Sequence, residues 1–132
     1  MNRIKNLFLV DDDDIFIFLS KKDIEHSDLV EKITVFNNGL DALNFIKENI
    51  NNPELLPEII LLDIAMPIMD GWQFLKEYEK INSGIEKTIT IYMCTSSISP
   101  DDISRTKEIS AVSDYLIKPI TGEKVIEIMN KL

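Results

Sequence analysis

The chain has 132 residues, 45% hydrophobic and 28% charged, which is typical of a globular protein and not of a disordered tail. Acidic residues outnumber basic ones by 23 to 14, and the net charge of −9 argues against nucleic-acid binding, which needs a basic face. The single cysteine cannot form an internal disulfide. Because the sequence shows no signal peptide and no membrane-spanning run, we expect one cytoplasmic domain over residues 1–132 and no membrane partner.

Five short, β-branched apolar runs predict β-strands. They are Leu7–Val10, Ile33–Phe36, Ile59–Leu62, Thr88–Met93 and Tyr115–Ile117. Their starts lie roughly 25–30 residues apart, a spacing that suits strand–helix units with crossover connections. Each run is continuously apolar, which is typical of parallel strands covered by helices on both faces.

The first two connecting segments carry helical signals of unequal strength. Ile15–Leu19 taken alone could form a strand. We interpret it as a helix because it must connect two neighbouring parallel strands, and because Ile24 continues the pattern. The second segment has a clearer stripe at helical spacing, made of Leu43, Ile46 and Ile50.

The last three connecting segments have recognisable helix starts. Asp70 is interpreted as the cap of a third helix, whose stripe consists of Phe74, Leu75, Tyr78 and Ile81. Ser99–Asp102 combines a cap, a proline at the first helical position and two acids, but few apolar residues follow, so this fourth helix should be held weakly. Thr121 caps the fifth helix. The sequence therefore predicts an α/β fold, a five-stranded parallel sheet doubly wound with five helices.

Polar side chains follow four of the predicted strands. Asp11–Asp14 follow the first, Asp63 the third, Thr95–Ser97 the fourth and Lys118 the fifth. In a parallel sheet these ends meet at one edge, where ligands bind. Several carboxylates brought together call for a cation, and Mg²⁺ prefers such oxygen ligands. An ionised aspartate beside Mg²⁺ can attack phosphorus, while an ammonium and a hydroxyl neutralise and hold the transferred group.

Each of these residues also has an ordinary explanation when it is taken alone. A run of aspartates is commonly a solvated face, and we expect Asp13 or Asp14 to cap the first helix. Asp63 could simply form a turn. We interpret His26 as a surface residue and Cys94 as a buried small hydrophobe. The joint arrangement at successive strand ends is what favours phosphoryl transfer.

With these clusters in place, the chain resembles the receiver domain of two-component response regulators over nearly its whole length. The matching stretches are Leu9–Asp12, Leu62–Pro67 followed by Asp70–Gly71, Thr95–Ser96, and Tyr115–Pro119. The resemblance implies a flavodoxin-like (βα)₅ fold. It also implies that Asp63 is the phosphoacceptor and that Mg²⁺ is the cofactor. The metal site would consist of Asp11, Asp12, Asp63 and the backbone carbonyl of Ala65, with Asp11 acting mainly through a bound water.

The resemblance assigns further roles to residues of the last two strands. Thr95 would be the switch hydroxyl, Tyr115 the switch aromatic residue and Lys118 the partner of the phosphate. Family members commonly carry a cis peptide at the bond that matches Lys118–Pro119. Ala65 and Ser97 stand at two positions that tune dephosphorylation, but the lifetime of the phosphorylated state does not follow from them.

The resemblance implies a phosphorelay switch. A sensor histidine kinase or a histidine phosphotransfer protein would supply the phosphoryl group, and the fourth helix, fifth strand and fifth helix would form the changing partner surface. Such a protein is no enzyme beyond its own phosphorylation and dephosphorylation. One alternative is a degenerate receiver that only binds proteins. Another is a haloacid-dehalogenase-type phosphatase with Asp11 as nucleophile, although the chain is short for that fold and lacks its later lysine and acidic pair.

Overall fold

Five parallel strands form a single sheet in the computed structural model, which describes residues 3–96 and 99–132. In spatial order the sheet runs β2-β1-β3-β4-β5. The strands are β1 (Ile4–Val10), β2 (Val30–Phe36), β3 (Ile59–Asp63), β4 (Thr90–Thr95) and β5 (Val112–Ile117). Every neighbouring pair is parallel, so all carboxyl ends of the strands lie along one edge.

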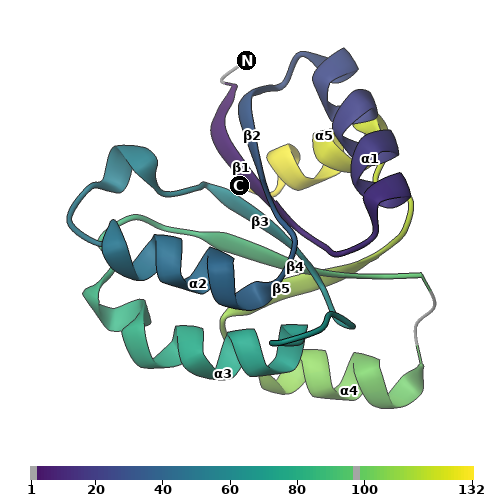
Figure 1. Cartoon of the computed structure of the whole chain (residues 1–132). Helices are drawn as coiled ribbons and strands as arrows, with labels where there is room; N and C mark the ends of the chain where they lie inside the picture. The colour runs from purple at the N-terminus through teal and green to yellow at the C-terminus, as the bar shows by residue number, and fades with distance from the viewer. Residues whose placement is uncertain (1–2, 97–98) are drawn as a thin grey trace.

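Helices cover both faces of this sheet (Figure 1). They are α1 (Asp14–Ser27), α2 (Gly39–Glu48), α3 (Gly71–Ile81), α4 (Pro100–Glu108) and α5 (Gly122–Asn130). Helices α1 and α5 pack on one face, and α2, α3 and α4 lie on the other. Two short 3₁₀ turns, Pro53–Leu55 and Asn82–Gly84, lie in the loops before β3 and β4. The predicted doubly wound α/β sheet with five helices is confirmed.

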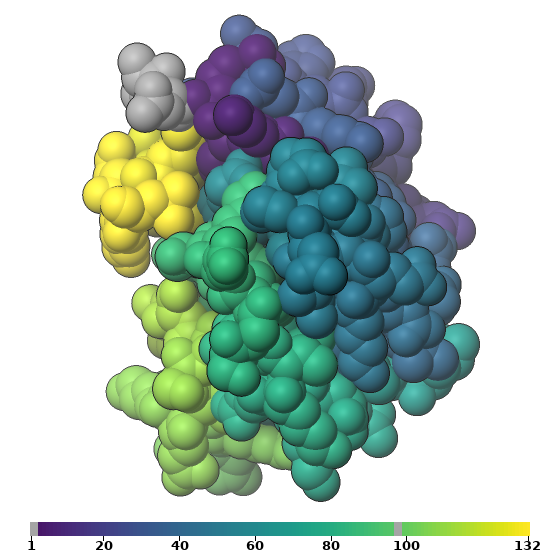
Figure 2. All heavy atoms as spheres, turned by 90° about the vertical axis from the view of Figure 1, so that its left-hand side faces the viewer, coloured from purple at the N-terminus to yellow at the C-terminus, as the bar shows by residue number. Residues whose placement is uncertain are grey.

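Two apolar clusters, one on each face of the sheet, make up the core. The cluster under α2 and α3 includes Phe8, Leu43 and Phe74, and the cluster under α1 and α5 includes Ile24 and Val125. The second cluster joins segments far apart in the chain, and the yellow C-terminal atoms lie close to the purple N-terminal ones in Figure 2. No helix among residues 3–96 and 99–132 is both long and apolar enough to cross a membrane.

The two edge strands, β2 and β5, are less buried than the sequence predicted. All of β3 and nearly all of β4 is buried, whereas β2 and β5 are mostly half-buried or exposed, because an edge strand has a neighbour on one side only. Strands β1, β2 and β5 each begin three residues before the apolar run that predicted them. Those first residues belong to the strands because their backbones pair with a neighbouring strand. A pattern of apolar side chains does not reveal such pairing. The stripe predicted to end at Ile50 is also too long, since α2 ends at Glu48.

The helix caps follow the sequence closely. Asp13 caps α1 by accepting hydrogen bonds from the amides of Ile15 and Phe16. Asp70 and Gln73 form a reciprocal capping box at the start of α3. Ser99 caps α4, whose first residue is a proline, and Thr121 caps α5. The segment that could have been a strand is therefore helical from its first turn.

Helix α4 buries fewer side chains against the rest of the protein than α3 does, as its small number of apolar residues predicted. Within α4, all of whose residues the structure describes, only Thr106 is buried. Its threonine hydroxyl donates to the carbonyl of Asp102 in the preceding turn. The guanidinium of Arg105 lies 4.3 Å from the ring centroid of Trp72, which joins α4 to α3 by a cation–π contact.

Candidate functional site

Three carboxylates meet at the carboxyl end of the sheet. Asp11 directly follows β1, Asp12 comes next, and Asp63 is the last residue of β3. Strands β1 and β3 are neighbours paired with Val10 opposite Leu62, so the residues that follow this pair emerge side by side. One oxygen from each of the three carboxylates lies within 4.8 Å of the others. The sequence prediction that these acids converge is therefore confirmed.

A lysine that follows the edge strand β5 reaches into this cluster. The ammonium of Lys118, one residue past β5, lies 2.7 Å from Asp11 Oδ2 and 3.3 Å from Asp63 Oδ1. Its backbone amide donates to the carbonyl of Thr95 at 2.8 Å, which fixes the start of this loop against β4. Asp11 is buried, and its second carboxylate oxygen accepts from the amide of Asp13 at 2.9 Å.

The electrostatics of the cluster are unbalanced. Burial raises the pKa of Asp63 to about 6, and the charge of Asp11 adds to this rise while Lys118 opposes it. Burial alone would lower the pKa of Lys118, but its hydrogen bonds and charge interactions with Asp11 and Asp63 together raise it. The lysine therefore stays charged, and one ammonium does not offset three neighbouring carboxylates. The remaining negative charge favours binding of a further cation.

The geometry suits magnesium. Oxygens on opposite sides of an octahedral Mg²⁺ are about 4 Å apart, so three carboxylate oxygens within 4.8 Å of one another need only small shifts to bind it. Asp12, the most exposed of the three acids, lines an open groove of about 520 Å³ together with Ala65, Asp70 and Trp72. The carboxylate of Asp12 is therefore open to solvent and ions from this groove. Ala65 lies two residues past Asp63 with an exposed side chain.

Comparison with known proteins identifies the family. The sequence model of the response regulator receiver domain matches residues 7–130. The chain belongs to the response regulator receiver family. As a receiver it is 29% identical to the chemotaxis protein CheY of Bacillus subtilis, over 93% of each chain. The structure of a two-component response regulator from Cytophaga hutchinsonii superimposes with a TM-score of 0.90 at 28% identity, covering 98% of this chain and 97% of that one.

Some relatives of this receiver are much longer proteins. It is 34% identical over 94 residues to the sensor histidine kinase CheAY of Helicobacter pylori, a match that covers 71% of this chain but 11% of the kinase. It spans 74% of the probable methanogenesis regulatory protein FilR2 of Methanothrix harundinacea, at 28% identity. The receiver unit is therefore shared among proteins of different overall organisation.

The remaining residues named from the sequence lie along β4 and β5 of the receiver. Thr95 ends β4 and is only 9% exposed. Tyr115 pairs with Met93 across the two strands and packs against the cluster under α2 and α3. The Lys118–Pro119 peptide is cis, as the family resemblance implied. Ser97 lies outside the described residues.

Three structural contacts around the receiver site were not predicted. The ring of Phe16 lies under the Lys118 ammonium, 4.2 Å from it to the ring centroid. Lys124 donates to the carbonyls of Ile117 and Pro119, on both sides of the loop that carries Lys118. A Cβ on Gly71 would lie 2.6 Å from the carbonyl oxygen of Asp63, so only glycine lets α3 begin this close to the end of β3.

The two residues set aside in the sequence lie where they were expected. Cys94 is buried in β4, and burial raises the pKa of its thiol to about 12, so the thiolate is scarcely populated near neutral pH. His26 is exposed in the last turn of α1. Neither side chain belongs to the acidic cluster.

Proposed function

We propose that this receiver is a phosphorelay switch of the cytoplasm, phosphorylated on Asp63 in a magnesium-dependent reaction. The donor is the phosphohistidine of a sensor histidine kinase or of a histidine phosphotransfer protein. The observation that carries the proposal is the position of Asp63, a nearly buried carboxylate that contacts Lys118 and lies within metal-binding reach of Asp11 and Asp12. This placement combines a nucleophile, a cation site and a fixed ammonium.

The chemical step moves the phosphoryl group from a nitrogen of the donor histidine to an oxygen of Asp63. An oxygen of Asp63 attacks phosphorus, the phosphorus–nitrogen bond of the donor histidine breaks, and its electron pair returns to the imidazole. Asp11, Asp12 and Asp63 would hold the magnesium ion, which would supply positive charge to the oxygens of the transferred group. Lys118 starts 3.3 Å from Asp63 and needs only a small movement to bind one of those oxygens.

The output is a change in the surface formed by α4, β5 and α5. Phosphorylation places new acceptor oxygens beside Thr95, which ends β4, and the hydroxyl moves to donate to one of them. Tyr115 on the neighbouring strand then fills the space that opens. Helix α4 buries a single side chain and repacks at low energetic expense, so it is the part of this surface most easily shifted.

The test of the acceptor uses acetyl phosphate as the small-molecule donor and intact mass as the readout. We expect one phosphoryl adduct that requires Mg²⁺, is absent in Asp63→Asn and forms with reduced yield in Asp11→Asn. An adduct that persists in Asp63→Asn but disappears in Asp11→Asn would instead indicate phosphatase-type chemistry. No adduct under any condition would favour a receiver that only binds proteins.

The switch has its own test. In the wild type, phosphorylation is expected to shift the amide resonances of α4, and Thr95→Ala is expected to suppress most of that shift while still accepting the phosphoryl group. Equal shifts in both proteins would show that the signal does not pass through the Thr95 hydroxyl.

A further inference from the structure

We propose that Phe16 is a positioning residue for phosphoryl transfer. Its aromatic face holds the Lys118 ammonium between Asp11 and Asp63, in the place from which it can bind a phosphoryl oxygen. The inference rests on the proposed function and adds a residue to its machinery. Phe16 belongs to α1 and lies outside the strand ends that supply the other groups.

The contact geometry is that of a cation–π interaction. The Lys118 nitrogen lies 4.2 Å from the centroid of the Phe16 ring, well inside the ~6 Å over which a ring attracts a cation. The side chain of Lys118 is 15% exposed and Phe16 is 7% exposed, so water screens the contact little. The ring therefore contributes more here than a similar pair would at the surface.

The ring and the acids are positioned by one continuous set of hydrogen bonds. The amide of Asp13 donates to Asp11 Oδ1 at 2.9 Å, and the carboxylate of Asp13 accepts from the amide of Phe16 at 3.2 Å. Asp13, the N-cap of α1, thus links the Asp11 carboxylate after β1 to the Phe16 ring in the first turn of α1. These two hydrogen bonds set the position of the Phe16 backbone relative to the Asp11 carboxylate.

A ring is chemically suited to this position. Lysine has a flexible four-carbon stem and a compact charge, so carboxylates on one side leave it several arrangements. A third carboxylate would hold the ammonium tightly and would compete with an incoming phosphoryl group. The quadrupole of Phe16 attracts the ammonium without neutralising it, and the ring excludes water from that side. Lys118 is kept in place and remains available to the substrate.

Phe16 also packs in the apolar cluster under α1 and α5, so its substitution affects stability as well. Two variants separate the two roles. Phe16→Leu keeps an apolar side chain but removes the aromatic face, whereas Phe16→Tyr keeps the face. Phe45→Leu is the matched control, because Phe45 is a half-buried ring packed against the cluster on the opposite face of the sheet from Phe16.

The first experiment measures the rate of phosphorylation by acetyl phosphate at saturating Mg²⁺, at a temperature where all variants are folded. We expect Phe16→Leu to lower the rate about five- to tenfold, while Phe16→Tyr and Phe45→Leu stay within about twofold of wild type. In a Lys118→Met background, Phe16→Leu should cause no further loss. A wild-type rate for Phe16→Leu, or an equal fractional loss without the lysine, would overturn the proposal.

The second experiment observes the lysine directly and needs no phosphorylation. The ring current of Phe16 should move the ε-methylene proton resonances of Lys118 upfield, and this displacement should vanish in Phe16→Leu but persist in Phe16→Tyr. Unchanged resonances in Phe16→Leu would refute the contact. If wild type forms no adduct at all, the proposed function fails, whereas a normal adduct with no dependence on Phe16 refutes this inference alone.

Discussion

Strand β3 has a lysine–carboxylate cluster at each end, and the two clusters differ in how completely their charges are satisfied. Glu58 immediately precedes the strand and pairs with Lys87. Asp63 ends the strand and shares Lys118 with Asp11. We refer to the first pair as the amino-end cluster, and to Asp11, Asp12, Asp63 and Lys118 as the carboxyl-end cluster.

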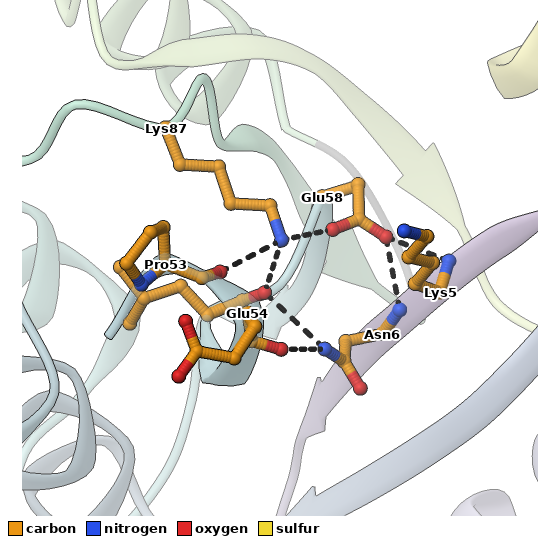
Figure 3. Close-up of polar contacts among 7 residues, drawn as sticks. Lys5, Asn6, Pro53, Glu54, Glu58 and Lys87 are labelled. Atoms are coloured by element: carbon orange, nitrogen blue, oxygen red, sulfur yellow. Dashed lines mark hydrogen bonds and ion pairs between the residues drawn. The ribbon is translucent and has the colours of Figure 1, made fainter.

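In the amino-end cluster every charge has its partners (Figure 3). The Lys87 ammonium donates to the carbonyls of Pro53 at 3.1 Å and Leu56 at 2.7 Å, and it forms an ion pair with Glu58 Oε2. The other oxygen of Glu58 accepts from two backbone amides of β1, those of Lys5 at 2.7 Å and Asn6 at 2.9 Å. One positive charge meets one negative charge, and together they tie the loops before β3 and β4 to β1.

The carboxyl-end cluster has one lysine among three carboxylates, and the pKa of Asp63 is raised to about 6 by burial and by Asp11. Such an arrangement destabilises the protein unless something else binds. We infer that the balanced amino-end cluster has a structural role, and that the unbalanced carboxyl-end cluster binds a cation and the group that a cation attracts. Changing the two lysines separately should therefore affect different properties.

The largest effect is expected from Lys118→Met. The variant removes the ammonium that we propose binds a phosphoryl oxygen, and loss of one such group typically lowers a rate about 10²–10³-fold. The measurement is the rate of adduct formation with acetyl phosphate and Mg²⁺ by intact mass. Lys87→Met is the control and should react at the wild-type rate, since its ammonium belongs to the other cluster. Equal rate losses in both variants would contradict the division of roles.

The second prediction concerns magnesium. A ligand that binds only the folded state at 100 times its dissociation constant raises the free energy of unfolding by about 2.7 kcal/mol. We expect a rise of this size for wild type and for Lys87→Met on addition of Mg²⁺, measured by urea denaturation with and without chelator. Asp12→Asn should lose most of it, because this residue supplies one of the three clustered oxygens. Full stabilisation of Asp12→Asn would remove that residue from the metal site.

The third prediction concerns the amino-end cluster. Lys87→Met leaves two carbonyls and one oxygen of Glu58 without their donor, which should lower the free energy of unfolding by about 1–3 kcal/mol. Urea denaturation gives the value, and Glu58→Gln, which removes the negative charge but keeps an acceptor oxygen, should cost less. If Lys118→Met lowered the free energy of unfolding more than Lys87→Met does, with Mg²⁺ present, both clusters would be structural.

The carboxyl-end cluster was predictable from the sequence because of a rule of parallel sheets. Residues that directly follow successive strands must lie along one edge, so Asp11, Asp63 and Lys118 were placed together without knowledge of any side-chain contact. Asp13 as the α1 cap and the weak hold on α4 also followed from local residue types. These features depend on neighbours in the chain or on strand order alone.

The contact between Phe16 and Lys118 was not predictable in the same way. It depends on the rotation of α1 relative to the loop after β5, which is set by packing over the whole α1–α5 face. The pair of Glu58 and Lys87 was missed for a similar reason, because two charged residues in separate loops give no periodic signal. The early starts of the strands were missed since backbone pairing, and not apolarity, defines those residues.

The last prediction concerns pH in the metal-free protein, where burial and Asp11 raise the pKa of Asp63 and Lys118 opposes that rise. The folded pKa of about 6 exceeds the ordinary 3.8, so between these values the folded state binds more protons than the unfolded one. The contribution of Asp63 to stability is therefore complete below about pH 4 and is lost as the pH rises through 6.

Urea denaturation at several pH values, compared with Asp63→Asn, isolates this contribution from that of the other acids. Between pH 4 and 6, wild type should lose stability relative to the variant as the pH rises, and above that range the difference should stay constant. Mg²⁺ should abolish the relative loss, because it binds the ionised carboxylate. The amino-end variant Lys87→Met should show the same pH response as wild type. If the pH dependence of the free energy of unfolding changed in Lys87→Met but not in Asp63→Asn, the unbalanced charge would belong to the amino-end cluster.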